Sequence, residues 1–154
     1  MTAPVLKRSL GEAGAAIDES HGAPSRLYDV MKALLKAGVP LQAAQAGAIS
    51  AGVKARTVAQ FDGVIGDIGV RVGVCGTAGS TTVVVNKNGT PLATAPAAIA
   101  NTDPDPTSVS KDLSGDAAAA FVKGDVIDIE VTAAGTGATD LDATLHLRPA
   151  SIEP

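Results

Sequence analysis

A β-branched run that ends in Asn88-Gly89 constrains the fold of this chain more than any other stretch. The three consecutive valines at 83–85 favour an extended backbone. Asn-Gly takes up positive φ at both central positions of a type I′ turn, and such a turn matches the twist of the strands that it joins. Residues 81–94 are therefore predicted to form a β-hairpin, with Asn88 and Gly89 as its turn residues.

Downstream of residue 55 the apolar residues recur with the period of a β-strand. Apolar and polar residues alternate most clearly over 127–131 and 141–148, so each strand buries one face and wets the other. Short strands separated by Gly, Pro and Asp, without a long intervening helix, predict a mainly β fold. We expect an antiparallel, jelly-roll-like β-sandwich over 56–150, an exposed Pro-rich loop at 101–106 and a short tail at 151–154.

Residues 1–55 are predicted to form an N-terminal arm, one amphipathic α-helix and a linker. Residues 1–23 show no sustained period, and residues 40–56 are rich in Ala, Gly and Gln, with room for a short helical turn. Between them, residues 24–38 carry apolar side chains at helical spacing, and Pro40 blocks continuation of the helix. The predicted partner interface is this stripe: Leu27, Val30, Met31, Leu34 and Leu35. It packs either on the β domain or on another subunit or protein.

Composition argues against several classes of partner. The 154-residue chain has a net charge of −4, and its Lys and Arg are scattered singly, so no nucleic-acid partner is expected. It lacks the roughly 20-residue apolar stretch of a membrane span, and its beginning lacks an apolar leader, so we expect no membrane partner and no export. With no Trp, one Tyr and two Phe, it has few ring platforms for a sugar, which speaks against glycan binding without excluding it.

Two carboxylates and two histidines are the residues to weigh for acid–base chemistry. Asp128 and Glu130 lie two apart on a predicted strand and share a face, as the paired carboxylates of a glycosidase do. Without aromatic residues nearby to hold a sugar, a wetted outer face is the better interpretation. His21 lies in the predicted arm and His146 on the outer face of a strand, and neither has an evident partner.

The remaining candidates also have structural explanations. Cys75 lies in an apolar run without a cation that would activate it, which predicts a buried thiol. The Gly-rich residues 76–80 lack the lysine and the helix of a phosphate-binding loop. Asp103 and Asp105 do not have the spacing of a calcium loop and are expected to be solvated. The sequence therefore predicts no catalytic residue, no metal site, no cofactor and no enzyme.

The span from about residue 60 to residue 148 resembles the small β-sandwich modules of tailed-phage virion proteins. Such modules occur in capsid decoration proteins, head fibres and some tail or neck proteins. The resemblance is carried by the segments Phe61-Asp62-Gly63-Val64-Ile65-Gly66, 70–76, 83–90, Lys123-Gly124-Asp125-Val126-Ile127 and Gly135-Thr136-Gly137. It implies a jelly roll that assembles around a symmetry axis, often a threefold, without catalytic residues.

The resemblance implies a non-enzymatic virion structural protein. The expected role is a capsid decoration (cement) or head-fibre protein that is made in the host cytoplasm and binds the major capsid protein on the capsid exterior as a homotrimer. One alternative is a tail, neck or receptor-binding module for a host surface glycan, which requires an exposed polar groove. The other is a hydrolase that uses Asp128 and Glu130.

Overall fold

A computed structural model of the chain describes residues 33, 38–93 and 96–150. The chain divides into a unit at 1–37 and a unit at 38–154, and the fold described below belongs to the second. Of the predicted helix only Ala33 and Gly38 lie among the described residues. The predicted arm, the tail at 151–154 and the predicted interface stripe lie outside them; the stripe is Leu27, Val30, Met31, Leu34 and Leu35.

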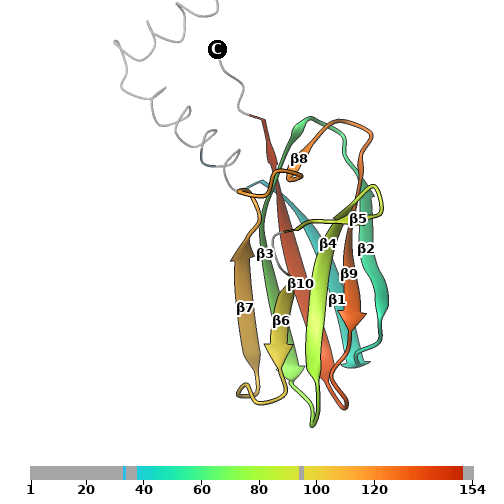
Figure 1. Cartoon of the computed structure of the whole chain (residues 1–154), viewed down its shortest axis with the longest axis vertical. Helices are drawn as coiled ribbons and strands as arrows, with labels where there is room; N and C mark the ends of the chain where they lie inside the picture. The colour runs from blue at the N-terminus through green and yellow to red at the C-terminus, as the bar shows by residue number, and fades with distance from the viewer. Residues whose placement is uncertain (1–32, 34–37, 94–95, 151–154) are drawn as a thin grey trace, which may run out of the picture. The chain divides into compact units, whose positions relative to one another are not determined.

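Ten β-strands of the described residues form two antiparallel sheets (Figure 1). Sheet A has the order β1-β10-β3-β7, with β8 also paired to β3; sheet B has the order β2-β9-β4-β5, with β6 also paired to β4. The predicted mainly β architecture is confirmed. The strands are β1 (Val39–Ala48), β2 (Gly52–Val58), β3 (Gly63–Val74), β4 (Ser80–Lys87), β5 (Thr90–Pro91), β6 (Ala97–Ala100), β7 (Thr107–Asp112), β8 (Ala120–Phe121), β9 (Val126–Ala133) and β10 (Thr139–Pro149).

The two-sheet unit, called the sandwich below, begins earlier than the sequence suggests. Strands β1 and β2 occupy the stretch predicted as a linker, so the predicted domain boundary between residues 55 and 56 falls inside β2 and is wrong. In β1 the inward positions Leu41 and Ala43 alternate with exposed Gln42 and Ala44. Because alanine occupies both faces, the period of two is hidden in the sequence.

Alternating residues of both sheets meet in one apolar core. Ile127, Ile129 and Val131 of β9 are fully buried, as are Leu145 of β10 and Val72 of β3. Full burial of one such side chain contributes about 1.5–3 kcal/mol, so this layer supplies most of the driving force for stacking the sheets. The strands predicted from alternation at 127–131 and 141–148 are thus present in β9 and β10.

The Asn-Gly turn joins β4 to a short β5. Asn88 and Gly89 have φ values of 51° and 79°, and Lys87 pairs with Thr90 across the two-residue loop. The second strand of the hairpin is only two residues long, and beyond it the N–H of Leu92 still donates to the backbone oxygen of Val85 at 2.9 Å.

Asp125 ties this turn to the segment before β9. Its Oδ1 accepts a hydrogen bond of 2.9 Å from Asn88 Nδ2, and its Oδ2 accepts one of 2.9 Å from the backbone N–H of Val122. Asn88 Oδ1 in turn accepts the N–H of Val126 at 2.8 Å. The hydrogen bond from Asn88, followed by that from Val122, lowers the pKa of Asp125.

The chain enters and leaves the sandwich at one end. Val39 at the start of β1 pairs with Leu147 near the end of β10, and Pro149 pairs with Gly63. We call this the proximal end. The opposite, distal end carries the loops β1–β2, β3–β4, β6–β7 and β9–β10 (Figure 1).

We predict that Gly89→Ala destabilises the domain by about 1 kcal/mol or more, because an alanine side chain is strained at φ 79°. The matched control is Gly115→Ala, since Gly115 has no positive φ and a Cβ there meets nothing within 4 Å. Chemical denaturation of both variants checks this. Equal stability of the two would contradict the strained turn.

We predict that Asp125→Asn lowers stability at about pH 7 and that its difference from wild type shrinks at about pH 2.5. A carboxyl whose pKa is depressed in the folded state stabilises above its unfolded pKa of about 3.9, and this stabilisation is lost as pH falls through the folded pKa. Denaturant midpoints at the two pH values measure it. A deficit that is the same at both would show that Asp125 acts without its charge.

Candidate functional site

The two carboxylates considered for hydrolysis are joined in a structural network on sheet B. Asp128 is 2% exposed, so the expectation of a wetted face is wrong for this residue. Arg56 Nη2 donates to Asp128 Oδ2 at 2.9 Å, and Asn86 Nδ2 donates to Asp128 Oδ1 at 2.8 Å and to Glu130 Oε2 at 2.7 Å. The strands β2, β9 and β4 bring these groups together. Both oxygens of Asp128 are thus occupied by cross-strand partners.

The β6–β7 loop at the distal end uses its carboxylates to hold backbone. Asp105 Oδ1 accepts the N–H of Cys75 at 2.6 Å, and Asp103 Oδ2 accepts the N–H of Ala100 at 2.9 Å. Cys75 is 1% exposed; burial, and then the nearby Asp105, raise the pKa of its thiol. In the described part of the chain no cluster of three or more His, Cys, Asp or Glu could hold a metal ion.

His146 does have a partner, on the outer face of sheet A. Its Nδ1 lies 3.0 Å from Asp67 Oδ2, and Arg148 Nη2 donates to Asp67 Oδ1 at 2.6 Å. Burial raises the pKa of Asp67, but the hydrogen bond and charge of His146 and the hydrogen bond from Arg148 outweigh it, so the net shift is downward. Sequence reasoning missed this cluster because Asp67 is far from the other two in the chain.

Beside this cluster, sheet A carries an open groove of about 300 Å³ with polar side chains along it, which is the candidate functional site. Gly69 of β3 lies at its centre, flanked in register by Thr144 of β10 and Ser110 of β7. In the next row Arg71 lies between Asp142 and Ser108. Nothing in the sequence marked this site except a glycine at an outward position of a strand.

The ion pair at one end of the groove is loose. Arg71 Nη1 lies 3.5 Å from Asp142 Oδ2, and the two side chains are 52% and 61% exposed. Exposed pairs of this kind contribute little to stability, commonly 0–1 kcal/mol. Both charged groups are therefore available to a ligand at small energetic cost.

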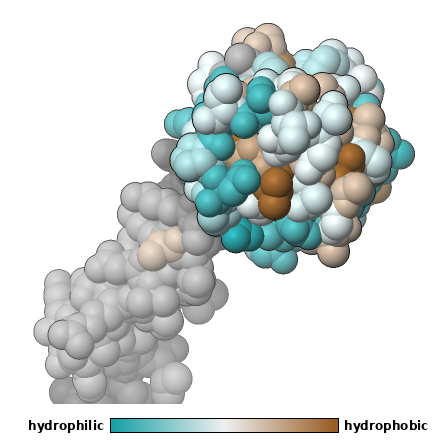
Figure 2. All heavy atoms as spheres, turned by 90° about the horizontal axis from the view of Figure 1, so that it is seen from below, coloured by the Kyte–Doolittle hydropathy of each residue, from teal (hydrophilic) through white to brown (hydrophobic). Residues whose placement is uncertain are grey.

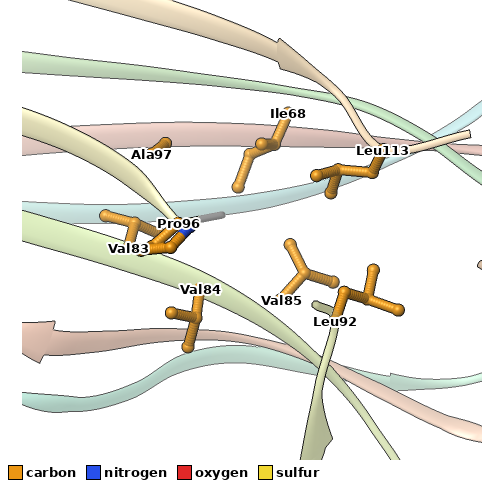
Figure 3. A pocket seen from close by; sticks show the side chains of 8 residues that line it. All are labelled: Ile68, Val83, Val84, Val85, Leu92, Pro96, Ala97 and Leu113. Atoms are coloured by element: carbon orange, nitrogen blue, oxygen red, sulfur yellow. The ribbon is translucent and has the colours of Figure 1, made fainter. Parts of the chain in front are cut away.

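A second hollow, between the sheets, is too small for a ligand (Figure 3). It has a volume of about 10 Å³ and an apolar lining that includes Ile68, Val85, Leu92 and Leu113. A water needs at least roughly 10–15 Å³ together with polar partners. The hollow is thus a packing gap and not a binding site.

The distal end offers no broad apolar surface on its described residues. Figure 2 looks onto this end and shows small hydrophobic patches separated by polar and small residues. Val74, at the end of β3, is one exposed apolar side chain there, at 41%. Patches of this size are normal on a protein surface and do not mark a docking site.

Comparison with protein-family models and with curated proteins finds no match to this sequence. The described residues also contain no helix long and apolar enough to span a membrane.

We predict that Arg56→Gln destabilises the domain by about 1–3 kcal/mol, because the buried carboxylate of Asp128 loses its charged partner. Arg71→Gln is the matched control, since it breaks a cross-strand pair whose aspartate is exposed, and it should stay within about 0.5 kcal/mol of wild type. Guanidinium unfolding at neutral pH compares the two. Equal losses would refute a special role for the buried carboxylate.

Proposed function

We propose that this chain is a non-enzymatic structural protein of a tailed-phage virion: a capsid decoration (cement) or head-fibre protein. In this role it is made in the host cytoplasm, binds the outside of the major capsid lattice and stabilises it. One observation carries the proposal. The chain enters the sandwich after residues 1–37 and leaves it toward the C-terminus at the same end, the proximal end. A module attached through one end presents the other outward.

The connectivity of the strands supports a jelly roll. When the two-residue strands β5 and β8 are set aside, the order β1-β10-β3-β7 faces the order β2-β9-β4-β6. Successive strands then alternate between the sheets, apart from the β4–β6 step within sheet B. Jelly rolls serve in viral capsids and in lectins. Because fold alone does not define function, the resemblance of residues 60–148 to phage modules gives the proposal its direction.

The use of polar side chains supports a structural role over a catalytic one. Asp128 pairs with Arg56, Asp105 holds the backbone of Cys75, and Asp125 holds the Asn-Gly turn. In each case a carboxylate connects separate strands or loops. Such contacts stiffen a scaffold and require no cofactor.

The unpaired edge of the sandwich supports assembly as a homo-oligomer, which we propose is a trimer. Strands β1 and β2 end their sheets on the same side, and Val39, Val53 and Val58 there are 50%, 44% and 48% exposed. An unpaired edge with exposed apolar side chains can pair with the edge of another chain. In an oligomer of closed symmetry every such edge is covered and the assembly stops at a fixed size.

A second candidate function is recognition of a host surface glycan by a tail, neck or receptor-binding module. That function requires an exposed polar groove, and the groove around Gly69 on sheet A supports it, because Arg71 and Asp142 stand at one end of it. Recognition of a glycan and attachment to a capsid use different surfaces in this account, so one chain can carry both.

We predict that deleting residues 1–37 leaves a folded domain that no longer sediments with undecorated capsids. The predicted helix should attach through its apolar stripe, so Leu34→Asp with Leu35→Asp should also weaken co-sedimentation, with little dependence on salt. The matched control is Ser25→Asp with Ala33→Asp, which adds the same charge off the stripe. Full binding by the truncated protein would move the capsid contact to the sandwich.

A further inference from the structure

One glycine of sheet A has no role in the fold. Gly69 lies in the interior of β3, between β10 and β7, and is not among the residues with positive φ. A Cβ built there meets nothing within 4 Å. Glycine weakens a strand because it packs nothing and loses more backbone entropy than other residues. Any small side chain would fit here and favour the strand.

Neighbouring glycines of the same strand do have structural reasons. A Cβ at Gly66 would lie 2.8 Å from Arg148 Nε, and one at Gly73 would lie 2.9 Å from the Cβ of Asp140. At Gly63 it would collide with the backbone oxygen of Arg148. The space above Gly69 is therefore the feature that sets it apart. A glycine inside a strand marks a bulge, a tight bend, or a place where a ligand or another backbone approaches closely. The pairing of β3 with both neighbours is regular at Gly69, so we take this glycine as a place of close approach.

The groove above Gly69 has rigid walls made by three paired strands. Thr144 and Ser110 stand on either side of Gly69, two inter-strand spacings apart, or about 9.5 Å between Cα atoms. Two residues further along, Arg71, Asp142 and Ser108 form the end of the groove. The strands β3 and β10 are paired on both sides, so their backbone groups are used within the sheet. β7 is the end strand of sheet A, and its outer edge points away from Gly69, so the floor of the groove offers side chains.

The chemistry of the walls selects the class of ligand. Three hydroxyls can each donate and accept a hydrogen bond, the guanidinium of Arg71 donates, and the carboxylate of Asp142 accepts. The two charges offset one another, which disfavours a strongly charged ligand such as a phosphate. A volume of about 300 Å³ is at the small end of ligand pockets. We propose that this groove binds one neutral pyranose unit of a glycan, its ring seated over Gly69.

The expected affinity is low. A hexose has about 12 non-hydrogen atoms, and at the efficiency of ordinary ligands this gives a Kd on the order of 1 mM. No aromatic side chain lines the groove to add stacking. Several copies in one assembly would raise the avidity for a repeating polysaccharide without any new contact.

The test is titration of the full-length, isotope-labelled protein with glucose, galactose, mannose and N-acetylglucosamine, followed by NMR chemical shifts. At least one sugar should shift amides of Gly69, Ser110 and Thr144 in a saturable way. Gly69→Val should melt no lower than wild type and bind at least tenfold more weakly. The control Gly115→Val, at another glycine with open space around it, should bind like wild type.

Two results of the sugar titration would overturn the proposal. One is the absence of saturable shifts for all four sugars up to about 50 mM, roughly fifty times the expected Kd. The other is wild-type sugar binding by Gly69→Val. Co-sedimentation of Gly69→Val with capsids distinguishes a failure of the sugar site from a failure of the capsid proposal. Loss of capsid binding in this variant would make the groove a protein contact and would also refute the sugar site.

Discussion

The structure depends on the stacking of two sheets through side chains that alternate with a period of two. Leu141 and Leu145 of β10 pair in register with Val72 and Ile68 of β3, and all four are buried. A shift of the strand pairing by one residue would turn these side chains to solvent and expose this layer of the core. The same register fixes what the outer faces display: once Leu145 points inward, Thr144 and His146 must point outward. The polar groove is thus a consequence of the core.

Polar residues in this sandwich connect elements that the core leaves separate. Asp128 links β2 and β4 through Arg56 and Asn86, and Asp67 links β3 to β10. At the proximal end, Asp125 links the segment before β9 to the Asn-Gly turn. Each of these carboxylates has a charged or amide partner on another segment. These links stiffen the sandwich, as the proposed role on a capsid requires, and none of them uses the hydroxyl groups around Gly69.

The features that depend on local sequence preferences were predicted from the sequence. The Asn-Gly turn follows from backbone preference, and β9 and β10 follow from strict alternation. Prediction from the sequence failed at β1, where alanine on both faces removes the contrast between inside and outside, and at β2, where Val53 and Val58 are themselves exposed. It also failed at Asp128 and His146, whose partners lie 72 and 79 residues away in the chain. Only when strands pair does a charged side chain become buried on an outer face, or the lack of a side chain leave a groove. No single stretch of the sequence therefore encodes either feature.

The proposed function requires that the sandwich is a preformed module and that it is attached through residues 1–37. Hydrogen–deuterium exchange of the full-length protein, free and bound to undecorated capsids, tests it most directly. The account predicts that new protection is concentrated in residues 1–37, while amides of β3, β9 and β10 and of the distal loops exchange as in the free protein. New protection of the distal loops or of the groove strands, with none in residues 1–37, would contradict it.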